Sequence, residues 1–276
     1  MLKIIIWDVQ HGSSSYIRTP NNQHIVIDLG TGSRSDLTFS PLRYLNSHWG
    51  VKQLDCVVIT HPHRDHLDDI FNFDSLSPKV LYRPNHISEA SIKKSNRDVD
   101  SDIISKYIEI SHRYTAAVLS DPLYSTNNGG VDIQTFVPTE CSESNINNHS
   151  IVTVLSYAGS KILIPGDNEP VSWKELLQRN DFRSAIKNTN ILVAPHHGRD
   201  SGFCNELFDY ISPDLTIISD GRLCDTSATE RYANKTNGCT VCRRNGGTAE
   251  RRCVTTRNDG VVSIEVGPSY RKVTID

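Results

Sequence analysis

Four side chains that commonly bind metal ions stand within six residues of one another. They follow the apolar run at 57–59 in the segment DCVVITHPHRDH and are His61, His63, Asp65 and His66. Imidazole nitrogen and carboxylate oxygen are ligands that zinc and similar ions accept. Buried together without a cation, these polar groups would be costly, because nothing would replace their hydration. The segment therefore predicts a metal site, against the alternative of a chance cluster on a solvated loop.

The geometry of such a site depends on the strands that lead into it. His61 and His63 are two residues apart, so on an extended segment they face the same side, before the chain turns at Asp65 and His66. Apolar, β-branched runs predict further strands along the chain, at residues 2–7, 24–29, 54–60, 131–137, 150–157, 161–166, 190–195, 215–219 and 260–266. Helices are predicted between them, at residues 40–48, 67–73, 101–118, 169–179, 203–210 and 227–236.

Continuous runs of valine and isoleucine indicate sheets that are covered on both faces. We therefore expect an α/β fold in which two packed sheets carry helices on both outer faces, a four-layer αββα sandwich. We find no internal repeat and no linker, so residues 1–276 are predicted to form a single domain. Residues 84–105 are polar and weakly patterned, and we expect a surface insertion there, with a mobile lid as one interpretation.

Composition narrows the class of protein. The formal net charge of the 276 residues is -3 and the sequence pI is about 6.4, so no global basic field indicates nucleic acid or a membrane as a partner. The apolar run at the N-terminus is too short for a signal peptide, and we expect a cytoplasmic protein. Seven cysteines, an odd number, favour reduced thiols over a disulfide framework.

The pattern His-x-His-x-Asp-His after an apolar strand resembles the signature of the metallo-β-lactamase superfamily, whose fold is an αββα sandwich. Two later segments resemble further elements of that superfamily. KILIPGDNE is similar to its strand-Gly-Asp element, which makes Asp167 the carboxylate expected to bridge two ions. NILVAPHHGRDSG is similar to its last histidine motif, with His196 or His197 as the ligand.

One branch of that superfamily, the domain found in the DNA-uptake protein ComEC and its soluble relatives, resembles the chain over about residues 2–266. The opening segment, the HHG motif and the segment 147–150 (NNHS) carry this likeness. The resemblance gives Asp28 the role of accepting a hydrogen bond from a ligand imidazole, with a turn aspartate as the alternative. The chain departs from the pattern at 10–13 (QHGS), where an acidic group is missing. The superfamily's middle histidine has no certain match, and His149 is either that ligand or a solvated turn histidine.

The resemblance implies a metal-dependent hydrolase that uses two divalent ions, zinc or manganese, to activate a hydroxide against a phosphorus or carbonyl centre. Asp65 and Asp167 are the candidate catalytic residues, since Asp167 would bridge the ions and Asp65 would help to orient water. The expected ligands of the first ion are His61 and His63 with His149, and those of the second are Asp65, His66 and either His196 or His197.

A basic segment offers a candidate surface for substrate. Residues 222–257 carry eight basic and three acidic side chains, and the candidate contacts in it are Arg243, Arg244, Arg251 and Arg252. The segment would suit a phosphodiester backbone, although a solvated face is the commoner meaning of a charge run. Together with the resemblance it favours a phosphodiesterase or nuclease with nucleic acid as partner. The alternatives are hydrolysis of a small ester, lactone or thioester, or a metal-stiffened module that binds a protein partner.

Four late cysteines permit a second metal site. Cys239 and Cys242 have the spacing of zinc ligands, and Cys224 and Cys253 lie at irregular distances on either side. The alternative is a strand pair with small buried thiols, which the neighbouring valines favour. The sequence leaves both interpretations open.

Overall fold

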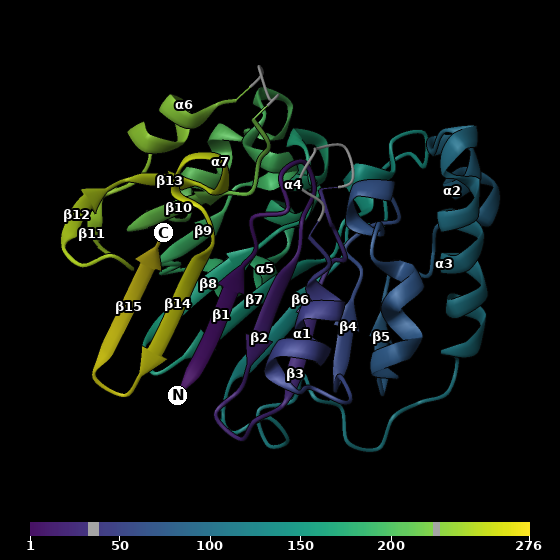
Figure 1. The fold of residues 1–276 in the computed structure, drawn as a ribbon. Coiled ribbons are helices and arrows are strands. Elements are labelled where there is room, and N and C mark those ends of the chain that lie inside the picture. The colour runs from purple at the N-terminus through teal and green to yellow at the C-terminus, as the bar shows by residue number, and fades with distance from the viewer. Residues whose placement is uncertain (33–38, 223–226) are drawn as a thin grey trace.

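The computed structural model describes residues 1–32, 39–222 and 227–276, and its strands form two mixed sheets (Figure 1). The first sheet contains β1 (Leu2–Ile6), β2 (Ser15–Arg18), β3 (His24–Ile27), β4 (Cys56–Val58), β5 (Val80–Tyr82), β11 (Cys239–Arg243), β12 (Thr248–Arg251), β14 (Val262–Gly267) and β15 (Tyr270–Ile275). The second contains β6 (Asp132–Phe136), β7 (Val152–Tyr157), β8 (Ser160–Ile164), β9 (Ile191–Val193), β10 (Leu215–Ile218) and β13 (Cys253–Thr255). Their spatial orders are β12-β11-β15-β14-β1-β2-β3-β4-β5 and β13-β10-β9-β8-β7-β6.

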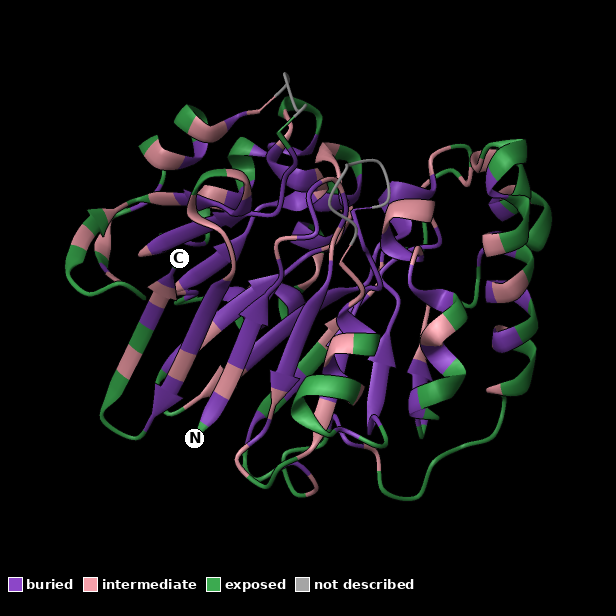
Figure 2. Cartoon of the chain, in the orientation of Figure 1, coloured by how far each residue is buried: buried purple, intermediate pink, exposed green. Residues whose placement is uncertain are grey.

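Helices cover the outer face of each sheet, which confirms the predicted αββα sandwich. The helices packed on the first sheet are α1 (Pro41–Trp49), α2 (Glu89–Ser95) and α3 (Ser101–Arg113). Those packed on the second sheet are α4 (Pro170–Gln178), α5 (Asn180–Ile186) and α6 (Thr229–Asn234). A short helix, α7 (Thr256–Asp259), follows β13. Most strands are buried, except β11, β12 and β15 at one end of the first sheet, and the outer helix faces are exposed (Figure 2).

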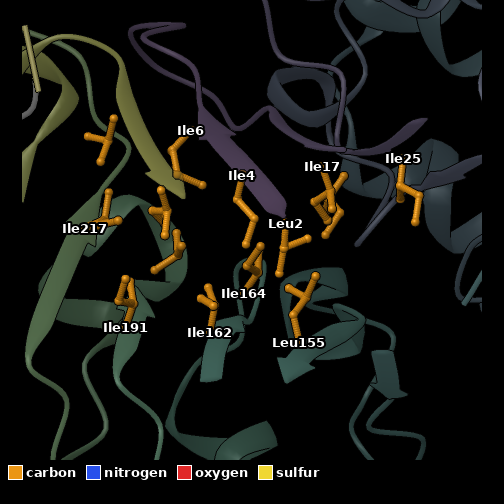
Figure 3. Packing of buried hydrophobic residues seen from close by; sticks show 14 of the residues in the cluster. Leu2, Ile4, Ile6, Ile17, Ile25, Leu155, Ile162, Ile164, Ile191 and Ile217 are labelled. Carbon is orange, nitrogen blue, oxygen red and sulfur yellow. The ribbon is translucent and has the colours of Figure 1, made fainter. Parts of the chain in front are cut away.

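Alternation of side chains along β1 explains how one strand supports two cores. Leu2, Ile4 and Ile6 point into the core between the sheets, whereas Ile5 packs with the helix-covered face. Figure 3 shows Leu2 and Ile4 facing residues of β7 and β8 across this core, which is almost wholly aliphatic. Burial of this apolar surface is the main force that holds the two sheets together.

The predicted strands are present, and the structure adds four that we did not predict: β2, β5, β12 and β15. Most of these four are short or carry polar residues, so the apolar signal is weak. The valines of the alternative strand pair do lie on strands, β11 and β13, but these strands belong to different sheets and do not pair with each other. The predicted helices at 67–73 and 203–210 are instead 3-10 segments, at Ile70–Leu76 and Asn205–Asp209. The polar segment 84–105 contains α2, whose only buried residue is Ile92, together with the start of α3.

Strand direction creates one edge at which several loops meet. β3, β4 and β5 run parallel, as do β8, β9, β10 and β13. Side chains that follow the carboxyl ends of parallel strands collect at the same edge of a sheet. Within the described ranges, no helix has the length and apolarity needed to cross a membrane.

Candidate metal centre

The first part of the centre follows β4. The chain leaves this strand extended, and a 3-10 turn at Arg64–His66 then redirects it. His61 and His66 are completely buried, and Nε2 of His61 lies 3.0 Å from Nδ1 of His63. Two imidazole nitrogens that approach so closely, one of them completely buried, are well placed to share a cation.

The second part follows β8, where Gly166 lets two loops pack closely. A Cβ atom on Gly166, whose φ is +61°, would lie 2.8 Å from the Cβ atoms of both Ser150 and Thr60. The backbone N–H of Asp167 donates to Ser150 Oγ at 3.0 Å. Helix α4 then begins under a capping box formed by Glu169 and Ser172. This tight turn holds the buried Asp167 carboxylate at the edge shared by both sheets.

The third part follows β9 and contains both candidate histidines of the HHG motif. His196 and His197 both adopt the left-handed backbone region, with φ values of +50° and +54°, and their rings contact different partners. His197 is buried, and its Nδ1 donates to the carbonyl oxygen of Ser219 at 3.0 Å, so Nε2 faces the cluster. His196 instead places Nδ1 3.3 Å from the Glu169 carboxylate, and its Nε2 is 4.0 Å from Asp167.

These parts converge on the carboxylate of Asp167. Nε2 of His66 is 3.2 Å from Asp167 Oδ1, and Nε2 of His197 is 3.4 Å from Asp167 Oδ2 and 3.4 Å from Asp65 Oδ2. Nε2 of His61 lies 3.9 Å from Asp167 Oδ2. Ligand atoms lie within 4.8 Å of one another in two groups, His61 with His66 and Asp167, and Asp65 with His66 and His197. Nitrogen and oxygen donors in this number suit divalent cations.

Asp28 supports the cluster from behind. Its Oδ2 lies 2.8 Å from Nδ1 of His66, and its Oδ1 accepts from the backbone N–H of Thr60 at 2.8 Å. Because the carboxylate accepts the Nδ1 proton, Nε2 of His66 is directed toward Asp167. The structure therefore places Asp28 against a candidate ligand, as the resemblance implied.

Electrostatics at the centre follow from burial and from the carboxylates. Burial lowers the pKa of His61 well below its usual value. Burial acts in the same direction on His66, but Asp167 and Asp28 outweigh it and raise the pKa of that imidazole well above its usual value. Burial opposes the ionisation of Asp167, yet its histidine neighbours hold its pKa well below the usual range. These neighbours favour the ionised form of Asp167, the form in which a carboxylate binds a cation best.

The structure does not bring His149 to the cluster. It ends a 3-10 turn at Ile146–His149, where residues two apart point in different directions because each turn has three residues. Nδ1 of His149 lies 2.8 Å from Nε2 of His86, and His149 neither lines the cavity described below nor belongs to either group of clustered ligand atoms. Asn147, in the same turn, lines the cavity instead.

Several residues at the centre were missed by the sequence analysis. His11 places Nε2 3.1 Å from Asp65 Oδ2, and the adjacent Gly12 packs so closely that a Cβ there would lie 2.6 Å from the Asp65 carbonyl oxygen. Asn147 and Glu169 are the others. The departure at 10–13 was the signal for His11, because a histidine stood where the family pattern has a different residue.

A cavity of about 230 Å³ opens over the cluster. Its wall includes candidate ligands from all three loops and three arginines, Arg64, Arg97 and Arg199. Arg64 and Arg97 both pair with the Asp100 carboxylate, at 2.7 Å and 2.9 Å. Segment 84–105 therefore reaches the centre and forms one wall of the cavity.

The late basic residues and cysteines lie elsewhere. Arg243 ends β11, Arg251 ends β12, and five strands separate β11 from β4 in the first sheet (Figure 1). None of the candidates Arg243, Arg244, Arg251 and Arg252 lines the described cavity. Cys239 and Cys242 are three apart on β11, so they point to opposite faces, and Cys253 is on β13 in the other sheet. Cys224 lies outside the described residues.

Comparison with known proteins identifies the family. Residues 7–179, more than half of the chain, match the model of the metallo-beta-lactamase superfamily. The chain belongs to this superfamily. A curated relative, "Competence protein ComA" from Neisseria gonorrhoeae, is 24% identical over 218 residues, which are 79% of this chain and 27% of that protein. The chain thus spans about a quarter of that relative's length, and the superfamily is one of metal-dependent hydrolases.

Several solved structures are similar to the chain at low identity. The metallo-beta-lactamase fold protein YhfI from Bacillus subtilis is 13% identical with a TM-score of 0.44, covering 81% of this chain and 88% of its own. Human tRNase Z, short form, is 12% identical with a TM-score of 0.47, covering 80% and 93%. A diphosphatase of the PhnP family is 9% identical with a TM-score of 0.49, covering 97% and 98%.

Proposed function

We propose that the protein is a phosphodiesterase that hydrolyses nucleic acid with two divalent metal ions, zinc or manganese. His61 and His63 would hold the first ion, and Asp167 would hold both. Asp65, His66 and His197 would hold the second ion. The proposal rests on the convergence of these donors, since Nε2 of His66 and Nε2 of His197 both approach the one carboxylate of Asp167 within 3.4 Å.

The bound ions would supply a nucleophile from water at neutral pH and neutralise charge on the phosphoryl group. The side chains would position this chemistry. Asp28 fixes the tautomer of His66, and the Ser219 carbonyl fixes that of His197. His11 contacts the Asp65 carboxylate from the cavity wall and limits its rotation.

Arginine in the cavity wall favours an anionic substrate over a neutral ester. Arg64 and Arg97 already have the Asp100 carboxylate as partner. Arg199 differs, because its buried Nε has no hydrogen-bond partner and its guanidinium has no ion pair in the part of the chain that the structure describes. A guanidinium presents its N–H groups in a fork that suits phosphate oxygens. This unpaired cation beside the cluster is the observation that carries the phosphodiester assignment.

The polymeric substrate is proposed on the resemblance to the DNA-uptake branch and on the relative described as a competence protein. The cavity supports it by its position, since the side chain of Arg97 in its wall is 58% exposed. An exposed cation next to a metal cluster would allow a chain of nucleotides to continue outside the cavity. The basic hairpin β11–β12 would then be a more distant contact for the same backbone.

The test is hydrolysis by purified protein that has been treated with chelator and resupplied with zinc or manganese. The substrates are single-stranded DNA, double-stranded DNA, RNA and bis(p-nitrophenyl) phosphate, with p-nitrophenyl acetate, a lactone and a thioester for comparison. We expect metal-dependent cleavage of phosphodiesters that is lost in Asp65→Ala and Asp167→Ala. Metal-dependent hydrolysis of only the ester, lactone or thioester would contradict the proposal.

A further inference from the structure

The two proposed ion positions have unequal ligand sets. The second position would receive Asp65, His66, His197 and the shared Asp167. The first would receive His61 and His63 with the same shared carboxylate, which is one donor fewer. Structural and catalytic sites for zinc usually have three or four protein donors, and harder ions take more. The first position therefore has room for another ligand from the chain.

Asn147 is the side chain that faces this position. It lies in the 3-10 turn Ile146–His149 and is only 8% exposed. It lines the cavity together with His63 and Asp167, and its side chain lies within hydrogen-bonding reach of His63, although not in the geometry of a full hydrogen bond. Its side-chain oxygen, Oδ1, is buried and accepts no hydrogen bond in the described residues. Burial of a carbonyl oxygen without a partner costs free energy. A bound cation or a hydrogen-bond donor next to this atom would remove that cost.

The orientation of the Asn147 amide is fixed by a neighbour. Its Nδ2 donates to Oε1 of Glu169 at 3.3 Å, and a carboxylate can only accept, so Oδ1 must point away from Glu169. Glu169 is itself held, because Asn145 Nδ2 donates to its other oxygen at 2.9 Å. His196 approaches the same carboxylate through Nδ1. The carboxylate thus acts as an anchor that presents Oδ1 to the cavity.

A buried amide oxygen without a partner indicates a metal ligand only when it also lies beside the other candidate ligands. Asn168 also has a buried Oδ1 without a partner among the described residues. Its Nδ2, however, bridges the carbonyl oxygens of Ser150 and Pro165, and Asn168 does not line the cavity. The hydrogen bonds of its Nδ2 give Asn168 a structural role, in which it joins two loops. Asn147 combines the free oxygen with a place in the cavity wall beside His63.

We propose that Oδ1 of Asn147 is the ligand that completes the first ion position, where the sequence offered only His149. The proposal rests on the two-ion site of the proposed function, but it does not depend on the substrate. An amide oxygen is a harder and weaker donor for zinc than an imidazole. The first position is thereby predicted to hold its ion less tightly than the second and to tolerate manganese.

The experiment is metal binding to the full chain, without substrate. Ion content after equilibrium dialysis gives stoichiometry and affinity, and manganese paramagnetic resonance reports the environment of each ion. The variants are Asn147→Ala, Asn147→Asp and Asn147→His, and His149→Gln is the matched control from the same turn. We expect Asn147→Ala to lower the affinity for one of the two ions by about tenfold or more. Loss of a contact that only supports a ligand already costs about tenfold in metal affinity, so loss of a ligand should cost at least as much.

The other variants sharpen the result. Asn147→Asp adds a negative charge and is expected to tighten manganese at the first position, whereas Asn147→His is expected to shift that position toward zinc. His149→Gln should leave both affinities within twofold of wild type. Retained binding of the second ion and an unchanged melting temperature show that a variant is folded. Should Asn147→Ala fail this check, the Asp and His variants decide the question alone.

Two results would overturn the proposal: both affinities unchanged in every Asn147 variant, or loss of the first ion in His149→Gln. Failure of this ligand assignment can be distinguished from failure of the proposed function. Wild-type protein that binds two ions, depends on Asn147 for one of them and cleaves no phosphodiester would leave the ligand assignment standing and reject the phosphodiesterase.

Discussion

The two halves of the metal cluster are supported very differently. Around the proposed second ion, the distal nitrogen of His66 is held by Asp28, that of His197 is held by the Ser219 carbonyl oxygen, and Asp65 is contacted by His11. Around the proposed first ion, the distal nitrogen of His61, Nδ1, contacts Thr60 Oγ1 at 3.3 Å, and no carboxylate or carbonyl oxygen holds it among the described residues.

This difference indicates how binding strength is distributed. A partner on the distal nitrogen fixes the ring and makes it a better donor, and removing such a partner usually costs about 10- to 100-fold in metal affinity. The second position has such partners on both imidazoles, and it also has an additional carboxylate. We therefore expect a tightly held second ion and a more exchangeable first ion next to the cavity.

Asp167→Ala should have the largest effect, because it removes the one donor that both halves share. Both ions should bind more weakly, and kcat/KM for a phosphodiester should fall by roughly three orders of magnitude or more, given that a metal ion contributes several kcal/mol to the transition state. Ion analysis and steady-state kinetics on one preparation measure both. A variant that keeps two ions and most of its activity would show that the cluster is not a shared site.

Asp28→Asn should affect the second ion position and not the first. Asparagine keeps the shape of the side chain and tolerates the positive φ of +60° at this position, but it no longer offers a carboxylate to Nδ1 of His66. We expect affinity for the second ion to fall about 10- to 100-fold while the first ion is unaffected. Titration with manganese, followed by paramagnetic resonance, distinguishes the ions. Equal loss of affinity for both ions would mean that the two positions are not supported differently.

Arg199→Gln should leave both ions in place and act on substrate alone. Loss of a charged hydrogen bond worth about 1.5–3 kcal/mol would lower kcat/KM for a phosphodiester by about tenfold or more. Most of the change should be in KM, since ground-state binding is lost. Arg243→Gln, on the distant β11, is the matched control and should stay within twofold of wild type. Equal effects of the two substitutions would mean that the cavity arginine has no special role.

Cys239→Ser together with Cys242→Ser should have the smallest effect. These thiols point to opposite faces of β11, so they cannot share an ion without rearrangement of the strand. We expect two ions per chain before and after the substitution, by ion analysis of dialysed protein. A fall by one zinc per chain would instead establish the second metal site that the cysteine spacing permits.

The sequence predicted the fold well because both of its main signals were strong. Continuous aliphatic runs marked the central strands, and His61, His63, Asp65 and His66 stood at a strand end in a specific spacing. The strands that escaped prediction, such as β2 and β15, carry polar residues on one face. Their pairing depends on neighbours from distant parts of the chain, which local patterns do not contain.

The proposed ligand set was less predictable for the same physical reason. His197 is a better candidate ligand than His196 because of contacts that arise only in the folded HHG turn, and Asn147 is a better one than His149 because of their places in a 3-10 turn. Asparagine also carries little weight as a metal signal in a sequence. The contacts of His11 and Glu169 come from loops that meet only in three dimensions.

The most direct test of the two-ion account is a titration of chelated protein with manganese while cleavage of single-stranded DNA is followed. The account predicts little cleavage while the first equivalent fills the tighter second position, and a steep rise as the next equivalent binds. Full cleavage after one equivalent, or cleavage that needs no added ion after complete chelation, would contradict it.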